Sequence, residues 1–470
     1  MTEPDHLLAL SREDLLALVA ALQRQIAELT ASNEALRAEI EQLRRQGKRQ
    51  AAPFSKGTRV AQPKRPGRKP GTGPFHYREA PPPEAITEPA IDVKVALEAC
   101  PTCGGPLAEE RVDLAYTTEF SEIPRPKVTQ YRVWVCRCVV CGTQVRGQHP
   151  DLSPDQYGAT AHRVGARAMA AAHVLHYGVG IPVRKVPVVL AALTGVRLTQ
   201  GALTQDALRR TTSTVGRAYE LLRAAVPEAP VVHTDDTGWR VGGEPAHLMA
   251  FDTDAATVYQ IRPRHRHEEV QEVIPADYAG VMVTDRGRSY DAQAFNRVDQ
   301  QKCLAHILRS ISDVGERKTG RAREFGEQLK TALQDALALW HEHRDGQATD
   351  FKVEAEALQA EITYQLRDRR LKDPDNQRLL NELGWHHDRG NVLRFLVDPR
   401  IEPTNNRAER ALRPAVIARK VSQCSKNTQG AVAFAAFTSV IRTLMKTGVG
   451  SLVDALAQLF HPTQPQHVRT

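Results

Sequence analysis

Three acidic residues in the second half of the chain have the side-chain type and the sequence setting of metal ligands. Asp235 and Asp285 each follow a short apolar run, and these β-prone runs predict two strands that end on an acid. Glu409 follows Asn406 by three residues, and Asn is a favoured helix N-cap, so Glu409 is expected in the first turn of a helix. Two aspartates at strand ends and one glutamate on a helix could share one metal site.

Such a site would suit the cleavage or joining of phosphodiester bonds. Mg²⁺ prefers oxygen ligands and is usually held by one or two carboxylates, with water and phosphate completing its coordination. Two such ions, about 3.5–4 Å apart, can serve both the attacking and the leaving oxygen. Each acid also has a structural alternative, because Asp-Thr-Gly and Asp-Arg-Gly are ordinary turn sequences and Asn406 with Glu409 fits a helix capping box.

Four sequence blocks together resemble the DDE transposases of the insertion-sequence-66 family, and the similarity extends over most of the chain. The blocks are His233–Thr237, Thr284–Asp291, Lys302–His306 and Thr404–Pro414, the last followed by Arg419 and Lys420. The resemblance implies an α/β RNase H-like catalytic domain in which Asp235, Asp285 and Glu409 hold two Mg²⁺ or Mn²⁺ ions. It also implies a DNA transposase that cleaves DNA at the ends of an insertion sequence and joins the 3′-hydroxyl ends to target DNA.

One position departs from the family pattern, and several others are implied as auxiliary to the site. The family usually has Asp-Glu-Thr where this chain has Asp235-Asp236-Thr237, so Asp236 is an alternative ligand, although the alignment favours Asp235. The resemblance places Cys303 and His306 beside the active site, and His306 is a candidate for contacting or orienting a phosphate. Positive charges that could grip the scissile phosphates, or form salt bridges to nearby acids instead, are Arg410, Arg413, Arg419 and Lys420.

The catalytic domain is expected at 228–462, with a charged helical insertion at about 310–398. Asp235 and Asp236 are expected in a turn. Pro414 is expected to end the helix that carries Glu409, so that Arg419 and Lys420 would follow on an extended stretch. The apolar segment 431–460 is expected to be helical and to pack behind the sheet. Strands are expected at 231–234, 246–251, 257–261, 280–284 and 300–304, and a helix at 267–274.

The composition of the whole chain is that of an ordinary soluble protein with an anionic partner. Its 470 residues are 41% hydrophobic and 25% charged, and they suffice for roughly two to four domains. No run of about 18 apolar residues and no secretory leader pattern occurs, so a cytoplasmic, nucleoid-associated protein without a membrane partner is expected. The net charge of +8 favours double-stranded DNA, as transposon ends and as target.

Residues 1–46 carry a heptad repeat that predicts a parallel two-stranded coiled coil. Mostly β-branched residues at one core position and leucine at the other favour dimers, and a single core Asn fixes the register. We therefore expect a homodimer, with accessory transposition proteins as further candidate partners. The alternative is one amphipathic helix that packs on its own domain. The core positions are Leu15, Leu22, Leu29, Leu36 and Leu43, with Val19, Ile26, Asn33 and Ile40 between them.

Residues 47–90 form a basic, Pro- and Gly-rich linker that cannot bury a core. Between Arg44 and Arg78 the chain has eleven Lys or Arg residues and no acid. Such a segment suits the phosphate backbone or a minor groove, and a plain solvated linker is the alternative. The candidate DNA contacts in it are Lys64, Arg65, Arg68 and Lys69.

Residues 91–150 contain two Cys-x-x-Cys pairs, each followed by Gly, which predict a small zinc-ribbon-like module with one structural Zn²⁺ ion. Tetrahedral Zn²⁺ takes four thiolates, and in a reducing compartment close-spaced cysteine pairs more often bind metal than form disulfides. The expected ligands are Cys100, Cys103, Cys138 and Cys141.

Residues 155–226 are expected to be helical, with a helix-turn-helix-like pattern. Candidate helices are 166–177, 187–193 and 199–222, and the connection between the second and third contains Gly195. A short turn of this kind would leave the following helix free to enter a major groove, while an ordinary helical scaffold is the alternative. The candidate DNA contacts are Arg184, Lys185, Arg209 and Arg210.

The sequence thus favours a Mg²⁺-dependent DDE transposase over two other classes of protein. A catalytically inactive DNA-binding regulator derived from a transposase is the first alternative, and the intact set of acids argues against it. A structural scaffold of zinc module and coiled coil is the second, and it predicts DNA binding with little dependence on salt.

Overall fold

The structure of the chain is a computed structural model. The chain divides into two units, of which one is Met1–Ser55 with Val128–Thr470 and the other is Lys56–Lys127. No helix among the described ranges is long and apolar enough to cross a membrane. The described residues are 11–47, 80–87, 89–91, 97, 99, 101–106, 114–117, 125–149, 151–152, 156–158, 161–316, 318–367 and 369–460.

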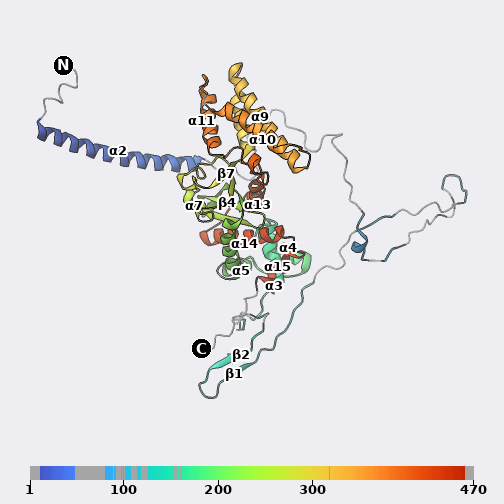
Figure 1. The fold of residues 1–470 in the computed structure, drawn as a ribbon. Coiled ribbons are helices and arrows are strands. Elements are labelled where there is room, and N and C mark those ends of the chain that lie inside the picture. Colours follow the sequence, from blue (N-terminus) through green and yellow to red (C-terminus); the bar gives the residue numbers. More distant parts are fainter. Residues whose placement is uncertain are drawn as a thin grey trace. The chain divides into compact units, whose positions relative to one another are not determined.

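A five-stranded mixed sheet lies in the larger unit (Figure 1). β3, β4 and β5 form an antiparallel meander, and β6 and β7 add in parallel on the other side of β3, which gives the order β5-β4-β3-β6-β7. The predicted mixed α/β fold is therefore confirmed. The strands are β3 (Val231–Val241), β4 (Glu244–Asp252), β5 (Thr257–Arg262), β6 (Val281–Thr284) and β7 (Asp299–Lys302).

β3 is longer than predicted, and this changes the setting of the acidic pair. The prediction of a turn at Asp235 and Asp236 is wrong, because both residues lie inside β3. The strand continues because every residue through Val241 pairs with β4 and because Trp239 is buried. The turn falls instead at Gly242–Gly243, where both residues have positive φ, a conformation that glycine adopts without strain.

Two other predicted boundaries near the sheet run too long. The helix expected at 267–274 is α7 (His267–Gln271), and its last residues form only a turn before Pro275. The strand expected to reach residue 304 ends at Lys302. The N–H of Cys303 still donates to the carbonyl of Thr284 (2.7 Å), but Cys303 is already the N-cap of the next helix, α8 (Leu304–Gly315).

Both edges of the sheet are covered by other parts of the chain. α14 (Thr428–Lys446) runs along β5, and the hydroxyls of Ser439 and Thr443 accept hydrogen bonds from backbone N–H groups of β5 (2.8 and 3.1 Å). At the other edge, the N–H of Lys302 donates to the carbonyl of Asn391 (2.7 Å). These bonds satisfy edge groups that could otherwise pair with another chain.

Helices pack on both faces of the sheet, and successive residues of a strand point to opposite faces. The face with Val232 and Met249 forms one core with the helices between 166 and 225, with α14 and with α15 (Leu452–Gln458). The face with Trp239 and Leu248 forms another core with α13 (Asn406–Ser422) and α14. The prediction that 431–460 is helical and packs against the sheet is therefore confirmed.

α13 continues through Pro414 instead of ending there. The prediction that Arg419 and Lys420 follow on an extended stretch is wrong, because both lie in the last turn of this helix. Proline removes one helix hydrogen bond and usually kinks a helix. Here Leu412, on one side of the proline, and other apolar residues beyond it are buried against β3 and β4, so packing maintains the helix across the break.

The insertion between β7 and α13 is helical, as predicted. Its helices share a core with Val283 of β6, so the insertion packs on the sheet as well as on itself. Figure 1 shows α9, α10 and α11 grouped together. The helices are α8 (Leu304–Gly315), α9 (Arg321–Arg344), α10 (Phe351–Leu366), α11 (Pro374–Asp388) and α12 (Arg394–Val397).

The segment before the sheet contains more helices than predicted. The helix expected at 199–222 is two helices, because the chain breaks at Thr212–Ser213, and the end of the helix expected at 166–177 is a π-helical turn. The connection at Gly195 has positive φ, as a glycine-containing turn requires. The elements are α3 (Ala166–His173), η3 (Val174–Gly178), α4 (Val186–Thr194), α5 (Gln200–Thr211), α6 (Thr214–Ala225) and η4 (Val226–Glu228).

The remaining described elements are short or separate. α2 (Arg12–Gly47) is a single helix over the predicted heptads, and β1 (Val135–Arg137) pairs with β2 (Gln144–Arg146) in a hairpin. The smaller unit contains the 3-10 turn η1 (Pro83–Ala85), and another 3-10 turn, η5 (Gln293–Phe295), lies between β6 and β7.

Candidate active site

Asp235 and Asp285 stand at equivalent positions on two adjacent strands. β3 and β6 are parallel, and His233 is paired with Val283, so two residues farther along each chain Asp235 is level with Asp285. Because side chains alternate along a strand, Asp235 points to the same face as His233, and Asp285 follows β6 directly. One oxygen of Asp285 accepts a hydrogen bond from the N–H of Gly287 (2.8 Å), which is the turn bond that its sequence predicts.

Glu409 reaches the same face of the sheet on α13, which contacts β3 and β4. It lies in the first turn of the helix, as predicted, but the capping box of Asn406 and Glu409 is wrong, because Asn406 is the first residue of the helix and the N-cap is Asn405. The amide of Asn405 instead donates to the carbonyl of Thr234 (2.8 Å), one residue before Asp235. Glu409 is half exposed and is therefore available to a ligand.

The negative charges of the three acids act on one another. The pKa of Asp235 is raised to about 7, mainly by burial and in part by the nearby charges of Asp285, Asp236 and Glu409. A hydrogen bond from the N–H of Asp236 (2.8 Å) opposes this increase in part. A carboxylate that is held among other carboxylates in this way gains most from a bound cation.

His306 lies between a buried thiol and Glu409. Its Nε2 is 4.0 Å from Oε1 of Glu409. Hydrogen bonding with the thiol of Cys303, and more weakly the charge of Glu409, raise the pKa of His306 against the effect of partial burial. Cys303 is itself fixed, because its sulfur accepts a hydrogen bond from the N–H of Asn405 (3.2 Å). The structure thus places His306 beside an acid, where the sequence block suggested it.

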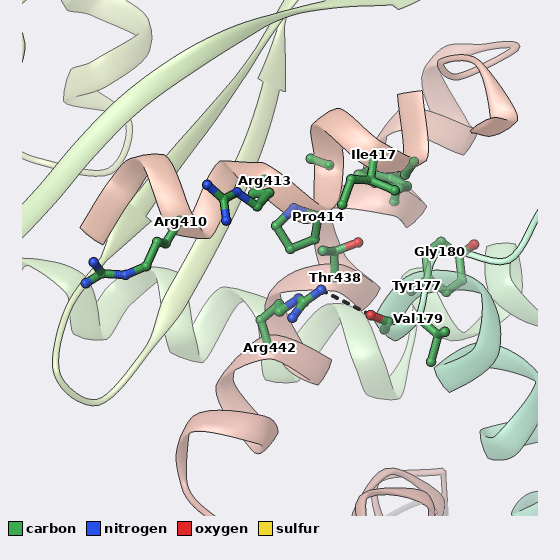
Figure 2. A pocket seen from close by; sticks show the side chains of 13 residues that line it. Tyr177, Val179, Gly180, Arg410, Arg413, Pro414, Ile417, Thr438 and Arg442 are labelled. Carbon is green, nitrogen blue, oxygen red and sulfur yellow. Dashed lines mark hydrogen bonds between the residues drawn. The ribbon is translucent and has the colours of Figure 1, made fainter. Parts of the chain in front are cut away.

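α13 carries basic residues directly after Glu409. Arg413 lies four residues after Glu409, and Lys420 lies seven residues after Arg413, so both are on the same face of the helix as Glu409. Both side chains are exposed. Arg410 and Arg413 line a pocket of about 170 Å³, and Tyr177 and Phe434 line it as well (Figure 2). None of the three acids lines this pocket.

Arg419 has a different environment from the other basic residues of α13. Its guanidinium donates to the hydroxyl of Thr237 (3.1 Å) and to the carbonyl of Gly238, so it fastens the end of α13 to the middle of β3. Arg419 therefore links the helix to the part of the strand that directly follows the acidic pair.

One known protein family has a model that matches the chain. The model for the family described as Transposase IS66 family matches residues 162–433, which is more than half of the 470 residues. The chain belongs to the IS66 transposase family. The resemblance carried by the four sequence blocks is confirmed, and all four blocks lie inside the matched region. Among curated proteins, none matches the chain.

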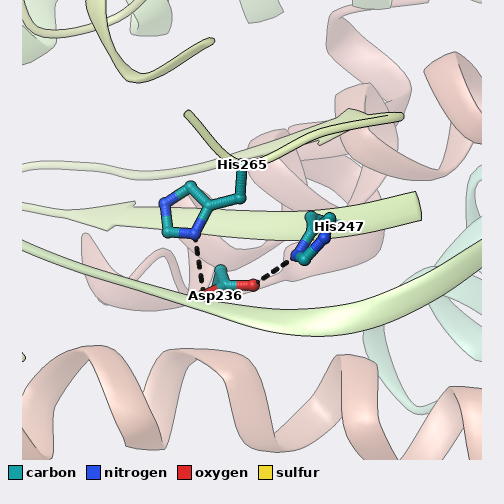
Figure 3. Close-up of side chains that lie close together, drawn as sticks. All are labelled: Asp236, His247 and His265. Carbon is teal, nitrogen blue, oxygen red and sulfur yellow. Dashed lines mark hydrogen bonds and ion pairs between the residues drawn. The ribbon is translucent and has the colours of Figure 1, made fainter. Parts of the chain in front are cut away.

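In this member of the family, Asp236 lies on the face of the sheet opposite to Asp235. Its two carboxylate oxygens are 2.7 Å from Nδ1 of His247 and 2.9 Å from Nδ1 of His265 (Figure 3). Among the described residues, these three supply the one group of donor atoms that all lie within 4.8 Å of one another. Asp236 is therefore directed away from the site that Asp235, Asp285 and Glu409 would form.

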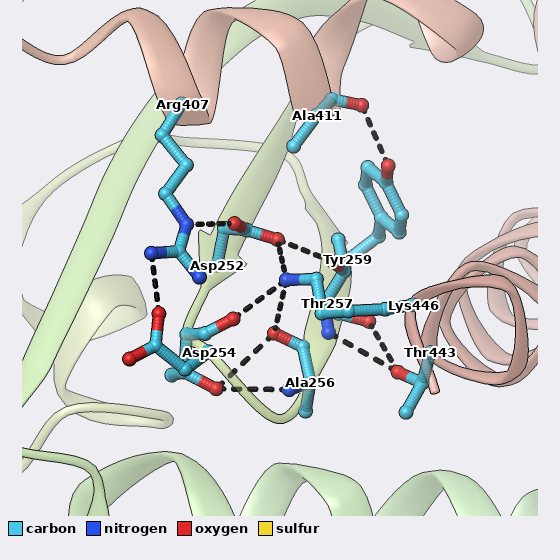
Figure 4. A network of polar contacts seen from close by, with 10 residues as sticks. Asp252, Asp254, Ala256, Thr257, Tyr259, Arg407, Ala411, Thr443 and Lys446 are labelled. Carbon is cyan, nitrogen blue, oxygen red and sulfur yellow. Dashed lines mark hydrogen bonds and ion pairs between the residues drawn. The ribbon is translucent and has the colours of Figure 1, made fainter. Parts of the chain in front are cut away.

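A buried polar network fixes the start of α13 (Figure 4). Arg407, two residues before Glu409, is paired with Asp252 (2.7 Å) and Asp254 (2.6 Å) in the β4–β5 hairpin, and Lys446 of α14 is paired with Asp252 (2.7 Å). Nothing in the sequence indicated that Arg407 or Lys446 would position this helix. Their partners are more than 150 residues away in the chain, and spacing alone carries no signal of such pairs.

Lys302 of β7, the first residue of the third sequence block, has buried contacts that the sequence did not predict. Lys302 is fully buried, and its ammonium is paired with Asp291 (2.7 Å) and donates to the hydroxyl of Thr284 (3.2 Å), directly before Asp285. Burial lowers the pKa of Lys302, and the charge of Asp291 opposes that decrease. Lys302 therefore connects both ends of the segment that follows Asp285.

The four predicted zinc ligands are divided between the two units, and one of them lies outside the described residues. Cys100 lies outside the described residues, Cys103 belongs to the smaller unit, and the other two belong to the larger one. In the β1–β2 hairpin, hydrogen bonds with Thr143 and with Cys138 lower the pKa of Cys141 to about 7, which favours the thiolate that zinc binds. The zinc site stays a prediction.

The candidate DNA contacts differ in environment. Arg184 and Lys185 are exposed at the start of α4. Arg209 and Arg210 both pair with the buried Asp206 (2.6 and 2.7 Å), and Arg210 is only 12% exposed. Arg210 also lies over the ring of a phenylalanine at the C-terminal end of the domain. The four candidates in the linker, Lys64, Arg65, Arg68 and Lys69, lie outside the described residues.

Proposed function

We propose that this member of the family cleaves DNA at the ends of an insertion sequence and joins the freed 3′-hydroxyls to target DNA. The observation that supports the proposal is that Asp235 and Asp285 lie level on adjacent parallel strands, while α13 brings Glu409 close enough for its charge to act on Asp235. The raised pKa of Asp235, caused mainly by burial and in part by the charges of Asp285 and Glu409, supports a site for divalent cations.

The fold supports the same proposal. Three antiparallel strands followed by two parallel ones, with the acids on the central pair and on a late helix, agree with an RNase H-like catalytic domain. The predicted divisions of the chain at 1–46, 47–90, 91–150, 155–226 and 228–462 belong to this proposal.

The donor set suits Mg²⁺ or Mn²⁺, since it consists of carboxylates alone. Asp235, Asp285 and Glu409 would hold the ions, which when bound supply activation of the attacking oxygen and stabilisation of the leaving one. The protein's own residues fix this set, because Asn405 and Arg407 hold the first turn of α13 in place. Asp236 has no part in it, because it is directed to the other face.

The basic residues next to the acids would bind the DNA backbone. Arg413 and Lys420 share a helix face with Glu409, so a strand whose scissile phosphate lies at Glu409 would extend along positive charge. His306, with its raised pKa, would carry a proton more readily beside a phosphate. Arg410 would extend the same surface toward the pocket on α13.

Capture of DNA ends is assigned to the amino-terminal half. The exposed Arg184 and Lys185 at the start of α4, with Arg209 on α5, would meet DNA in a helix-turn-helix-like manner, and the basic linker would add backbone contacts. Arg210 has a structural role in this proposal, since its charge is used by Asp206. DNA as substrate also favours the cytoplasmic, nucleoid-associated location.

α2 would pair two copies of the chain. It is one unbroken helix over the heptads, and its described core-position side chains are exposed in the single chain. Apolar side chains at these positions are typical of a seam that a second helix covers. The exposed side chains are Val19, Leu22, Ile26, Leu29 and Leu36.

Cleavage of a labelled duplex that carries the ends of the element encoding this chain tests the function. With Mg²⁺ or Mn²⁺, we expect cleavage and strand transfer by the parent chain, and loss of both in Asp235→Asn, Asp285→Asn and Glu409→Gln. Binding of the same ends without cleavage under any metal condition would support an inactive DNA-binding regulator instead.

A further inference from the structure

A second group of metal-ligating side chains lies on the other face of the sheet. Asp236 of β3 is in contact through one carboxylate oxygen with His247 of β4 and through the other with His265, in the loop between β5 and α7 (Figure 3). Both imidazoles present the same nitrogen, Nδ1, to the carboxylate. The three donor atoms lie within 4.8 Å of one another, a spacing that small shifts of side chains would convert into coordination of one ion.

The chemistry of this group differs from that of the three acids. Two imidazoles and one carboxylate suit Zn²⁺ and related transition metals, whereas Mg²⁺ prefers oxygen ligands. Three protein ligands leave coordination positions open to water. The group can be reached from solvent, because the side chains of Asp236 and His247 are 24% and 38% exposed. The side chain of His265 is only 10% exposed and is the most buried of the three.

We propose that Asp236, His247 and His265 form a mononuclear site for a divalent transition metal, for which Zn²⁺ is the best match. The site is separate from the cations that the three acids would hold, because it lies on the opposite face of β3. Its ligands also differ from those of the predicted cysteine site, which are all thiolates. The inference goes beyond the proposed function and does not depend on cleavage.

The position of the group indicates what a bound ion would do. The carbonyl of His265 accepts a hydrogen bond from the hydroxyl of Ser289 (2.7 Å), and the ring of Tyr290 packs edge-on against His265 at 5.4 Å. Both contacts belong to the segment that follows Asp285. An ion that joins His265 to β3 and β4 would therefore hold this segment to the strand that carries Asp235, from the far side of the sheet.

Zinc content of the purified full-length chain tests the proposal. The chain is equilibrated with Zn²⁺, freed of excess by gel filtration and measured by mass spectrometry of the metal, alongside His247→Gln, His265→Gln and the matched control His267→Gln. The side chain of His267 is as exposed as that of His247, and it lies two residues from His265. It contacts Glu268 and is outside the group. We expect both group variants to lose about one Zn²⁺ per chain, and the control to lose none.

A second readout keeps the test independent of folding defects and of the acid site. Zn²⁺ should raise the melting temperature of the parent and of Asp235→Asn more than that of His247→Gln, whose partly exposed side chain makes it the milder variant. Equal zinc content in parent, His247→Gln and His265→Gln would overturn the proposal. A loss of the same ion in Asp235→Asn would also overturn it, because it would assign the ion to the acid site.

Discussion

The side-chain amide of Asn405 donates a hydrogen bond to the backbone carbonyl of Thr234 at 2.8 Å, and this bond joins the helix of Glu409 to the strand of Asp235. The N–H of the same Asn405 donates to the sulfur of Cys303, where β7 gives way to α8. One buried residue thus fixes three elements that surround the acids. Its position in the sequence, at a helix N-cap, suggests only a local role.

Asn405→Ala should impair DNA cleavage far more than the same substitution at the neighbouring Asn406 does. The loss leaves a buried carbonyl without a partner and costs about 1–3 kcal/mol of the free energy of unfolding. Because α13 would then shift against β3, DNA cleavage should fall roughly 100-fold, as expected for misplacement of about 1 Å. The exposed Asn406→Ala is the control, and equal cleavage rates in the two variants would contradict the positioning role.

Asp252→Asn should destabilise the fold strongly. Asp252 is buried between Arg407 and Lys446, so its neutralisation leaves two cations without their shared partner and should cost about 3–5 kcal/mol in the free energy of unfolding. Urea denaturation measures this. Asp254→Asn is the matched control: its side chain is 89% exposed, so a change within about 0.5 kcal/mol is expected. Similar losses in both variants would show that the network contributes little.

Stability in acid should depend on Asp206. Burial would raise the pKa of this carboxyl, but the hydrogen bond from His173 and the charge of Arg210 outweigh it and hold the pKa well below its usual value. A depressed pKa means that the unfolded chain takes up the proton first, so the stabilisation is present above about pH 4 and is lost as the pH falls below it.

Burial of His173 lowers its pKa, so the unfolded chain also protonates this side chain first, and the loss of stability begins as the pH falls below about 6.5. Asp206→Asn should therefore have a lower melting temperature at pH 7 and a flatter dependence on pH than the parent. Melting curves between pH 3 and 8 measure both. Parallel curves for the two proteins would contradict the assignment of this acid sensitivity to Asp206.

The strands and their acids could be predicted from the sequence because their signal is local. Apolar β-prone runs placed β4, β5 and β6 closely, and the blocks around Asp235, Asp285 and Glu409 are contiguous. The turn at Asp235 was wrong because Asp-Thr-Gly is a turn signal by propensity, and pairing of β3 with β4 overrides it.

Contacts between distant residues could not be predicted in this way. Asp236 stayed open as an alternative to Asp235 until the structure placed both residues inside β3, where their side chains point to opposite faces. Arg210 has the sequence setting of an exposed helix residue, yet it is buried against Asp206 and the C-terminal Phe460. Pro414 is an ordinary helix stop, and only burial of both halves of α13 against the sheet explains why the helix continues.

Dimerisation through α2 should be removed by charge at its core positions. Leu22→Lys with Leu29→Lys places four lysines of a dimer in the seam, where apolar packing is lost. Light scattering after gel filtration should report a monomer for this variant and a dimer for the parent. Ala31→Lys, on the outer face of the predicted coiled coil, is the control and should remain dimeric. A dimer in all three proteins would place the dimer interface elsewhere.

Binding of Mn²⁺, followed by electron paramagnetic resonance, tests the central claim most directly. The claim is that Asp235, Asp285 and Glu409 together hold divalent cations. Asp285→Asn should weaken Mn²⁺ binding by at least about tenfold, whereas Asp277→Asn, an exposed acid away from the site, should bind as the parent does. Equal number and affinity of bound Mn²⁺ ions in the parent and in Asp285→Asn would contradict the account.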